Sequence, residues 1–424
     1  MTPAKGFAEM KGCGIEWIGE IPATWDVFPA GGVFDEVKEK NVNNQYSNPF
    51  SFRYGEIVDK KIAGEIDESV EETLSAYRVV SPNTIMINGL NLNYDFISQR
   101  VAIVREKGII TSAYLAVQPD EGRIVPRFVL YLLKAYDYRQ VFHGIGSGIR
   151  KTLKFQDFKS IKIVAPSLTE QSAIASYLDT QCAKIDEIIA QAKASIEDYK
   201  QWKASIIYEA VTKGLDPNVE MKDSGIQWIG NMPSHWEVIR GKYILRYMQK
   251  PVRDDDGVIT CFRDGEVTLR SNRREDGFTM SDKEIGYQGI DIGDLVVHGM
   301  DGFAGAIGIS DSRGKASPVL NVLDTNQNKR YIMYYLRSMA YSDVFLALAT
   351  GIRVRSCDLR WNKLADLSYP VPPLDEQKAI VEHVDAVLAK ADDVISDKKE
   401  QLATLDEYKK SLIFEYVTGK KEVV

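Results

Sequence analysis

The chain has 424 residues, of which 44% are hydrophobic and 27% charged, with a formal net charge of −7 at pH 7. This length allows two to four domains with real apolar cores, whereas no apolar run approaches the roughly 20 residues of a membrane span. The sequence shows no secretory signal, and its four cysteines and four histidines form no disulfide or metal-ligand pattern. We therefore expect a cytoplasmic protein without bound metal or membrane contact.

The first recognisable element is a Gly-Ile-x-Trp-Ile-Gly-x-x-Pro-x-x-Trp segment at residues 14–25, which recurs at residues 225–236. A repeat spaced by half the chain indicates a duplicated module rather than a solenoid. We expect the tryptophans of both copies to pack this segment rather than to contact a ligand. A protein with two related modules can read two sites at once.

Two blocks, residues 1–165 and 216–371, contain short β-branched runs separated by Gly, Asn and Asp turns. This pattern is typical of mixed α/β domains. Each block also has one clear helix, predicted at residues 126–142 and 329–345. The two helices align without gaps, which extends the duplication into the blocks.

Each block is followed by a long helix, predicted at residues 170–213 and 376–419. Thr169 and Asp375 follow prolines at equivalent positions, and both are predicted as helix N-caps. The predicted domains are therefore 1–165 and 216–371 for the two α/β blocks, with 166–215 and 372–424 for the two long helices.

Apolar residues recur every three or four positions along both long helices, which is typical of a coiled-coil seam. The predicted seam includes Trp202 in the first helix and Tyr408 in the second. Because neither seam has another partner, we expect the helices to pair with each other, antiparallel if the modules lie at opposite ends. A coiled coil alone would indicate only oligomerisation, but both helices also keep Glu-Gln at the start and Val-Thr at the end.

No catalytic motif can be identified. The glycine-rich run at residues 144–148 lacks the strand–turn–helix context of a dinucleotide site, and Gly314-Lys315 lacks the spacing of a P-loop. The acid–Pro–Pro–aromatic motif of an adenine methyltransferase and the nucleophile arrangements of hydrolases are also missing from the sequence. The chain is therefore predicted to bind rather than to catalyse.

Basic residues cluster at 127–162 and 329–363 although the whole chain is acidic. Each cluster contains a Gly-Ile-Arg tripeptide that suits phosphate, and Arg, Asn and Gln side chains can read base edges. Each side chain alone could be an ordinary solvated residue, but clusters in both copies favour contact with double-stranded DNA. The predicted contact residues of the first copy are Asn88, Asn91, Asn93, Tyr94, Arg100, Arg150, Lys151 and Lys154. Those of the second copy are Arg263, Arg270, Asn272, Arg273, Arg274, His298, Arg353, Arg355 and Arg360.

The order of these elements resembles the specificity (S) subunit of type I restriction-modification systems, over essentially the whole chain. The most specific shared feature is the doubled Pro-x-Leu-x-Glu-Gln-x-x-Ile motif at residues 166–174 and 372–380. Departures are small: Ser167 stands where the second copy has Pro373, and the closing Thr-Gly-Lys of the second copy is Thr-Lys-Gly in the first.

The resemblance implies an α+β fold with two α/β target recognition domains in a pseudo-twofold arrangement, joined by two long antiparallel helices that form a coiled coil. Each domain would read one half of an asymmetric, split DNA target, and the helices would set the spacer. The chain itself would have no catalytic activity and would bind no cofactor. It would dock two methyltransferase subunits, which methylate adenine with S-adenosylmethionine, and recruit restriction subunits that use ATP and Mg²⁺ for translocation.

Three other interpretations differ from this one. A specificity subunit of a methylation-only system has the same sequence features, so the sequence does not separate it from a restriction system. A self-sufficient methyltransferase or nuclease would need a cofactor-binding fold that we do not find in the sequence. A coiled-coil assembly protein without DNA binding would not need the two basic clusters.

Overall fold

The computed structural model of the chain forms two compact units. The first unit comprises Met1–Gln191 and Glu400–Val424, and the second unit comprises Ala192–Lys399. The predicted division into two α/β blocks and two helical segments is not tested by this spatial division and stays a prediction. Within the part of the chain that is described, no helix is long and apolar enough to cross a bilayer. The structure describes residues 7, 9–60, 68–96, 99–145, 151–273, 285–348 and 359–423.

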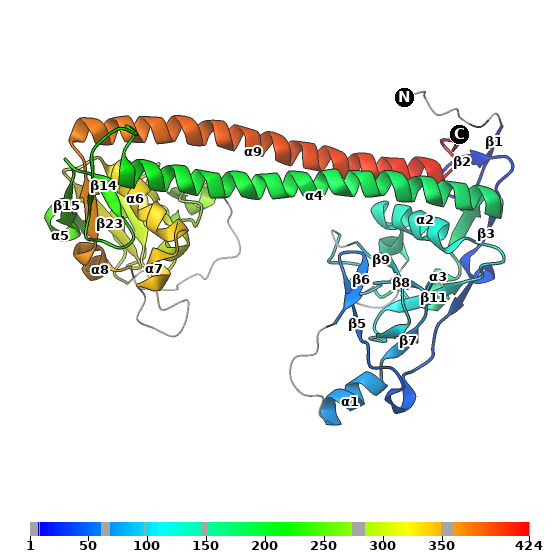
Figure 1. Cartoon of the computed structure of the whole chain (residues 1–424). Coiled ribbons are helices and arrows are strands. Elements are labelled where there is room, and N and C mark those ends of the chain that lie inside the picture. Colours follow the sequence, from blue (N-terminus) through cyan, green and yellow to red (C-terminus); the bar gives the residue numbers. More distant parts are fainter. Residues whose placement is uncertain are drawn as a thin grey trace. The chain divides into compact units, whose positions relative to one another are not determined.

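The first unit is built on a four-stranded antiparallel sheet with the order β4-β11-β8-β9. Its strands are β4 (Phe34–Glu36), β11 (Leu115–Pro119), β8 (Ile85–Ile87) and β9 (Val101–Ile103). The sheet lies beside α2 (Pro126–Tyr138), and α2 lies in turn against α4 (Leu168–Lys213) (Figure 1). All three residues of β8 are fully buried, with Ile85 and Ile87 in one apolar cluster and Met86 in another, so this strand is covered on both faces.

The second unit repeats this sheet with the order β16-β23-β20-β21, also antiparallel. Its strands are β16 (Leu245–Met248), β23 (Leu320–Thr325), β20 (Leu295–His298) and β21 (Ile307–Ile309). The connections run in the same chain order as in the first unit. The mixed α/β character and the duplication predicted from the sequence are therefore confirmed.

Shorter antiparallel strand pairs surround each sheet, and they too correspond between the units. In the first unit they are β1 (Met10–Gly12) with β2 (Glu20–Pro22), β3 (Asp26–Pro29) with β12 (Lys162–Ala165), β5 (Phe50–Arg53) with β6 (Glu56–Asp59), and β7 (Arg78–Val80) with β10 (Gly108–Ile110). In the second they are β13 (Met221–Asp223) with β14 (Asn231–Pro233), β15 (Glu237–Arg240) with β24 (Ser368–Val371), β17 (Ile259–Cys261) with β18 (Val267–Leu269), and β19 (Gln288–Ile290) with β22 (Gly314–Ala316). Short helices complete the units: α1 (Glu68–Ser75), α3 (Phe155–Phe158), α5 (Gly241–Ile244) and α8 (Trp361–Asp366).

The two helices that follow the sheets are shorter than the sequence predicts. Helix α2 ends at Tyr138, and its counterpart α6 (Lys329–Tyr341) ends before the predicted residue 345. Gln140 and Asp343 adopt left-handed φ angles of 56° and 55° at equivalent positions, and a left-handed residue ends an α-helix. Each chain segment then continues in a separate short helix, Val141–Gly144 in the first unit and α7 (Val344–Ala347) in the second.

The long helices α4 and α9 (Leu374–Val417) begin two residues earlier than predicted. Thr169 and Asp375 therefore lie inside the first turn, and the prediction that they are N-caps is wrong. In α4 the hydroxyl of Ser167 accepts the N–H of Glu170 at 3.4 Å, which is the contact expected of a capping residue. Asp375 instead places a negative charge at the positive end of the α9 dipole.

The two long helices pair in antiparallel fashion within each unit. In the first unit the hydroxyls of Tyr177 and Tyr416 lie 3.2 Å apart, and the Asp186 carboxylate is 2.6 Å from the Lys409 ammonium. In the second unit Lys203 forms an ion pair with Asp392. Residue numbers on α4 thus rise as those on α9 fall, which confirms the predicted pairing of the two helices.

The seam between these helices departs from the predicted one at equivalent positions. Trp202 and Tyr408 were placed in the seam by their spacing, but their side chains are 44% and 53% exposed. Toward the ends of the helices, Ile207 and Ile413 outside the predicted seam are buried, and so is Leu412, which the predicted seam includes. An α-helix has 3.6 residues per turn, so residues spaced by 3.5 drift slowly around it. Toward the helix ends, where the helices also contact the α/β cores, the buried face is therefore no longer the predicted seam.

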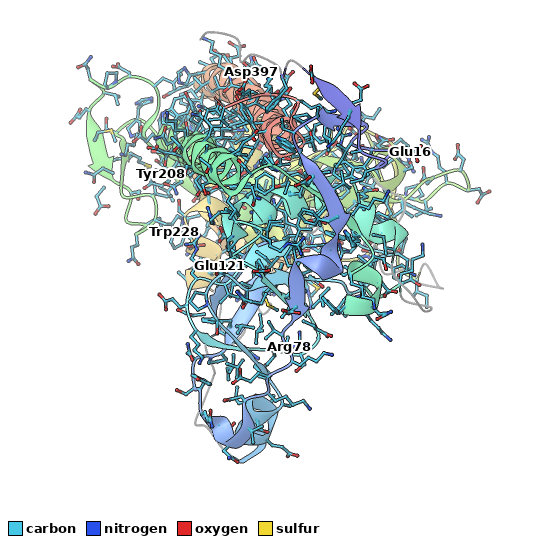
Figure 2. All side chains as sticks on the ribbon, turned by 90° about the vertical axis from the view of Figure 1, so that its right-hand side faces the viewer. Glu16, Arg78, Glu121, Tyr208, Trp228 and Asp397 are labelled. Carbon is cyan, nitrogen blue, oxygen red and sulfur yellow. The ribbon has the colours of Figure 1, made fainter. Side chains whose placement is uncertain are left out.

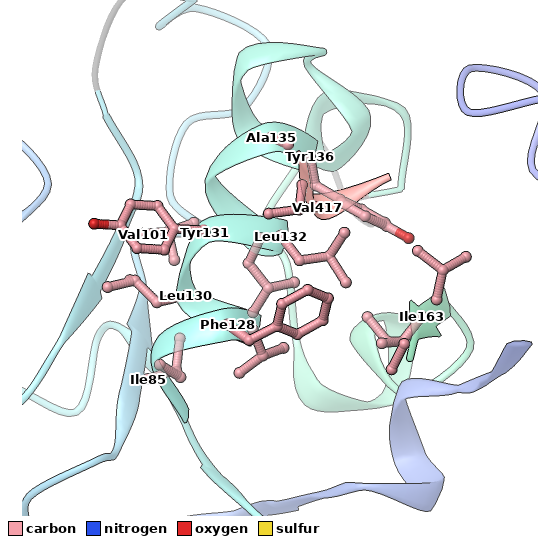
Figure 3. Packing of buried hydrophobic residues seen from close by; sticks show 14 of the residues in the cluster. Ile85, Val101, Phe128, Leu130, Tyr131, Leu132, Ala135, Tyr136, Ile163 and Val417 are labelled. Carbon is pink, nitrogen blue, oxygen red and sulfur yellow. The ribbon is translucent and has the colours of Figure 1, made fainter. Parts of the chain in front are cut away.

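The core of the first unit includes residues from the end of α9. Figure 3 shows Phe128, Leu132 and Tyr136 of α2 packed with Val417 of α9, and all four residues are buried. In the second unit, Val211 near the end of α4 occupies the corresponding place in the core around α6. Each α/β core is therefore completed by the end of the long helix that begins in the other unit.

The Glu-Gln pair at the start of each long helix joins the helix to its own unit. The indole N–H of Trp25 donates to Glu170 at 3.1 Å, and that of Trp236 donates to Glu376 at 3.0 Å. Gln171 is buried, and its side-chain carbonyl accepts the N–H of Val125 at 2.7 Å, directly before α2. In the second unit Gln377 accepts the N–H of Asn328 at 2.9 Å, directly before α6.

The glycine after each long helix fits against the opening segment of a unit. Gly419 follows α9 with a φ of 67°, and a Cβ at this position would overlap Pro22. Gly214 follows α4 with a φ of 74°, and a Cβ there would lie 3.2 Å from the ring of Trp236. Trp25 and Trp236 are fully buried, and Trp17 and Trp228 are half-buried against the two cores, which supports the expectation that the tryptophans have a packing role.

We predict that Gln171→Leu destabilises the first unit. The substitution leaves the N–H of Val125 and the carbonyl of Pro166, now 2.9 Å from the Gln171 amide, buried without partners. The free energy of unfolding should fall by roughly 2 to 4 kcal/mol. Urea denaturation, with hydrogen exchange of amides in the first unit as the probe of unfolding, measures this loss.

The matched control is Gln191→Leu on the same helix, where the side chain is exposed and bonds only to Glu187 at 3.3 Å. This change should alter the free energy of unfolding by no more than about 0.5 kcal/mol. Equal effects of the two substitutions would contradict a structural role for the buried glutamine.

Candidate nucleic-acid interface

The two groups of predicted contact residues in the first unit lie together. Residues 88–96 form a loop after β8, which we call the 88–96 loop. The N–H of Leu92 donates to the carbonyl of Lys151 at 3.2 Å, and the N–H of Leu153 donates to that of Gly89 at 2.9 Å. The polar 88–96 loop and the basic residues after the glycine-rich run therefore form one surface.

The side chains on this surface differ in exposure. Tyr94 is 73% exposed, and Asn91, Lys151 and Lys154 are also exposed. Asn88 is half-buried, and its side-chain oxygen accepts the N–H of Leu90 at 3.2 Å. Asn93 is half-buried as well. Exposed Lys and Tyr side chains can reach phosphates or bases without rearrangement of the loop.

Arg100 was predicted as a DNA contact, but its side chain is fully buried. Its guanidinium donates to the carbonyls of Asn88 at 2.8 Å, Leu90 at 2.9 Å and Asp95 at 2.5 Å. A base contact by Arg100 would require these bonds to break. The side chain therefore holds the loop from within in this structure.

Sequence reasoning missed Asp137 of α2, which lies behind the same loop. The Asp137 carboxylate is buried and accepts the backbone N–H of Arg100 at 2.6 Å. Burial raises the pKa of Asp137 to about 6, against the opposing effect of the Arg100 N–H and charge. One signal was available in the sequence: the gapless alignment of the two helices places Asp137 opposite Ala340, an acid against an apolar residue.

The second unit has a turn after β20 at the equivalent place. The Nδ1 of His298 accepts the N–H groups of Met300 at 3.2 Å and Asp301 at 2.9 Å, and burial lowers the pKa of His298. Arg263 forms a 2.9 Å ion pair with Asp301. Two predicted contact residues, His298 and Arg263, are thus brought together on this turn.

The remaining predicted residues that follow β18 are bonded to the β17–β18 hairpin. Arg273 pairs with Asp264 at 2.8 Å and with Glu266 at 3.1 Å. Asn272 donates to the hydroxyl of Thr268 at 2.8 Å, and Arg270 lies 3.5 Å from that of Thr260. These side chains would have to exchange protein partners for DNA partners.

Arg360 is exposed at the start of α8. It lies beside the turn after β20, because the N–H of the preceding residue, Leu359, donates to the carbonyl of Gly299 at 2.8 Å. Four predicted contact residues lie outside the described residues: Arg150, Arg274, Arg353 and Arg355.

Part of the basic clusters has a structural role that the sequence did not indicate. Arg127 on α2 bonds to the Asp179 carboxylate of α4 at 3.2 Å, and the hydroxyl of Tyr131 donates to the same carboxylate at 2.7 Å. The equivalent trio in the second unit is Arg330, Tyr334 and Asp385, with an Arg330–Asp385 distance of 2.6 Å. Burial raises the pKa of Tyr334 to about 12, and its hydrogen bond to Asp385 acts in the same direction.

A cavity of about 810 Å³ lies in the second unit between α6 and the long helices. Cations from three elements line it together with two tyrosines. Several of these cations already have carboxylate partners, so the cavity is less positive than its lysines and arginines suggest. The lining cations are Lys200, Lys203, Arg263, Arg330 and Arg337.

The second unit also contains an ion network without a predicted counterpart. Lys250 contacts Asp294 at 2.6 Å and Asp291 at 2.8 Å, and Arg313 contacts Asp291 at 2.6 Å and Asp256 at 2.8 Å. Hydrogen bonds from Lys250 and Arg313 hold the pKa of Asp291 at about 2. The hydrogen bond from Arg313 likewise lowers the pKa of Asp256.

Tyr208 of α4 and Trp228 of the second opening segment are labelled in Figure 2. The hydroxyl of Tyr208 donates to the carbonyl of Trp228 at 3.2 Å, which joins the end of α4 to the second unit. Over the described ranges, no group of three or more His, Cys, Asp and Glu side chains could hold a metal ion.

Comparison with protein families identifies residues 22–198 as a type I restriction modification DNA specificity domain. Two proteins of Methanocaldococcus jannaschii are similar over most of the chain: the provisionally named type I restriction enzyme MjaX specificity subunit and the MjaVIII specificity subunit. Each is 23% identical, over 96% and 99% of this chain respectively and 96% of the relative in both instances.

A solved structure described as the basis of complex assembly and conformational transition of a type I restriction-modification system has the same fold. It matches 94% of this chain and 99% of its own length with a TM-score of 0.66 and 15% sequence identity. This likeness confirms the mixed α/β fold with long helices.

We predict that Arg313→Met destabilises the second unit and flattens its response to acid. In the native chain, the depressed pKa values of Asp256 and Asp291 make their carboxylates stabilising above the ordinary value of 3.8. This stabilisation is lost as the pH falls from about 4 to about 2. Without Arg313, the buried Asp256 carboxylate keeps the N–H of Arg253 at 2.8 Å but loses its guanidinium partner, so stability at neutral pH should fall by about 1 to 3 kcal/mol. Denaturation at a series of pH values measures both effects.

The control is Arg246→Met, because the Arg246 side chain is 73% exposed although it also pairs with an aspartate. It should keep the acid sensitivity of the native chain and lose less than about 1 kcal/mol. The same pH dependence in both variants would contradict the role given to the network.

Proposed function

Because the chain belongs to the family of specificity subunits of type I restriction-modification systems, we propose that it recognises a split DNA sequence, with one half read by each unit. The observation that carries this proposal is a contrast: the two units share their contacts to the long helices but differ in their polar loops. Both units keep the same Trp–Glu, Gln and Arg–Tyr–Asp contacts to the long helices. The units differ in the polar surface that follows β8 in the first unit and β20 in the second.

The difference between the two loops supports an asymmetric target. Asn88 and His298 are equivalent, because each donates its N–H across the sheet, to Arg100 at 2.8 Å and to Ala306 at 3.0 Å. Asn88 and Arg100 are 12 positions apart, whereas His298 and Ala306 are only 8 apart. Two loops of different length and side-chain chemistry on one scaffold are suited to different base sequences.

The partners and cofactors belong to the same proposal. The chain would dock two methyltransferase subunits, which use S-adenosylmethionine, and restriction subunits, which use ATP and Mg²⁺. The duplication supports two equivalent docking sites, since exposed apolar residues recur at the helix starts, Leu168 and Leu374. The chain itself would be non-catalytic. A methylation-only system remains the second candidate, because it would use the same subunit.

We predict that deleting this gene removes adenine methylation at one split, asymmetric motif in the genome. The motif should consist of two defined halves separated by a spacer of fixed length, because each unit would read one half. Mapping of methylated adenines in cells with and without the gene measures this, and supplies the target sequence.

The control is re-expression of the chain from a plasmid, which should restore methylation at the same motif. An unchanged methylation map in a strain with an active methyltransferase partner would argue against the proposal. Loss of a continuous or palindromic motif would contradict the assignment of one half to each unit.

We predict that the long helices determine the spacer. Removing residues 187–193 and 393–399 shortens both helices by one heptad at equivalent positions and keeps the ion pairs Asp186–Lys409 and Lys203–Asp392 in register. The helices become about 10 Å shorter, which corresponds to about three base pairs. Methylation mapping should show both halves unchanged and a shorter spacer.

Removing only one of the two heptads is the control, because it puts the ion pairs out of register and should abolish methylation. A change in the half-sites with an unchanged spacer would mean that the helices do not set the distance.

A further inference from the structure

The 88–96 loop is held by a buried polar network that the second unit lacks. Arg100 donates to three carbonyls of this loop, and its own N–H is accepted by Asp137. His143 adds a further contact, since its Nε2 lies 2.9 Å from the carbonyl of Asp95. The Asp95 carbonyl is therefore contacted by two side chains, one from the residue before β9 and one from the segment after α2.

The second unit has apolar residues at the equivalent positions. Ala306 precedes β21 as Arg100 precedes β9, and both accept the corresponding N–H across the sheet. The gapless alignment of α2 with α6 places Ala340 opposite Asp137 and Leu346 opposite His143. Ala306 and Ala340 are buried, so this place in the second unit is filled by ordinary apolar packing.

Burying two ionisable side chains is costly compared with apolar packing, so the presence of Arg100 and Asp137 in one copy calls for a specific role. The longer 88–96 loop offers such a role, because the carbonyls of Asn88, Leu90 and Asp95 take their donors from the Arg100 side chain. Arg100 supplies those donors from inside the fold. Asp137 holds the Arg100 backbone through its N–H, and the Asp95 carboxylate lies 3.6 Å from the Arg100 guanidinium.

We propose that Arg100 and Asp137 are positioning residues that fix the 88–96 loop and thereby determine which half-site the first unit accepts. This inference rests on the proposed function, that each unit reads one half of a DNA target. Neither side chain touches DNA in this role. They set the places of Asn91 and Tyr94, whose side chains are exposed on the same loop.

The network also predicts a pH response confined to one half-site. Protonation of Asp137 removes one negative charge near Arg100 and leaves that of Asp95 at 3.6 Å, and the Asp137 pKa of about 6 puts this change in an accessible range. His143 is stacked on Phe96 with ring centroids 4.9 Å apart, and its Nδ1 is buried without a hydrogen-bond partner. The titratable groups that face Asp137 are Arg100, His143 and Asp95, and Asp137 shares the lining of a cavity of about 360 Å³ with Asp406 and Lys410 of α9.

The test compares Asp137→Asn, Arg100→Lys and Arg100→Met with the native chain, each expressed with its partner subunits. Asparagine imitates the protonated acid, and lysine keeps the charge but cannot reach three carbonyls at once. We expect methylation maps in which one half of the motif loses preference by about tenfold at one or more positions while the other half is unchanged. Asp343→Asn in the second unit is the matched control, because Asp343 is exposed and its side chain makes no capping bond.

A second readout uses the purified complex and DNA variants of either half-site. The native complex should lose selectivity for one half as the pH falls from 7 to 5, because Asp137 becomes protonated. Asp137→Asn should show the reduced selectivity at every pH and no such pH dependence. A purely structural role for Asp137 would leave the pH profile of this half unchanged.

The outcomes separate this inference from the proposed function. A native chain that produces no split motif would overturn both. A native split motif that both Arg100 variants and Asp137→Asn leave unaltered, with an unchanged pH profile, would overturn only the positioning role. If Arg100→Met fails to fold, Arg100→Lys and the pH profile of the native complex still decide the question.

Discussion

The structure depends on hydrogen bonds from a buried glutamine at the start of each long helix. Gln171 and Gln377 accept the N–H before α2 and α6, so the direction of each long helix is tied to its α/β sheet. A buried amide is stabilising only where its partners are all in place, because an unpaired one costs more than an apolar side chain. The neighbouring Trp–Glu bonds and Arg–Tyr–Asp contacts reinforce the same joint from two other sides.

These contacts between helix and sheet are common to both units, and the differences between the units lie elsewhere. The helices, the sheets and their contacts are the same in both units, whereas the loop after β8 differs in length and side-chain chemistry from the turn after β20. The contrast between Arg100 with Asp137 and Ala306 with Ala340 shows that the change reaches into the core. A new loop therefore comes with its own buried support, rather than being a surface substitution alone.

The sequence was sufficient to predict features that depend on long repeats. Periodicity located α4 and α9 to within two residues, and the duplication predicted two like units. It placed Trp202 in the seam wrongly, since the drift of the buried face depends on what the α/β core covers. Residue type suggested Arg100 as a DNA contact, and only the fold reveals that its partners are carbonyls of its own loop. Distant pairs such as Arg127 with Asp179 likewise need tertiary structure.

The packing of Gly419 and Val417 against the opening segment has a consequence for synthesis on the ribosome. The second unit is continuous in sequence, from Ala192 to Lys399, and can close as soon as it emerges. The first unit includes Glu400–Val424, so its core stays open while more than half of the chain is translated. At about 5 to 20 residues per second, this interval lasts on the order of 10 to 50 s. The part of the protein that is made first is therefore the last to be completed, and it needs protection from aggregation during that time.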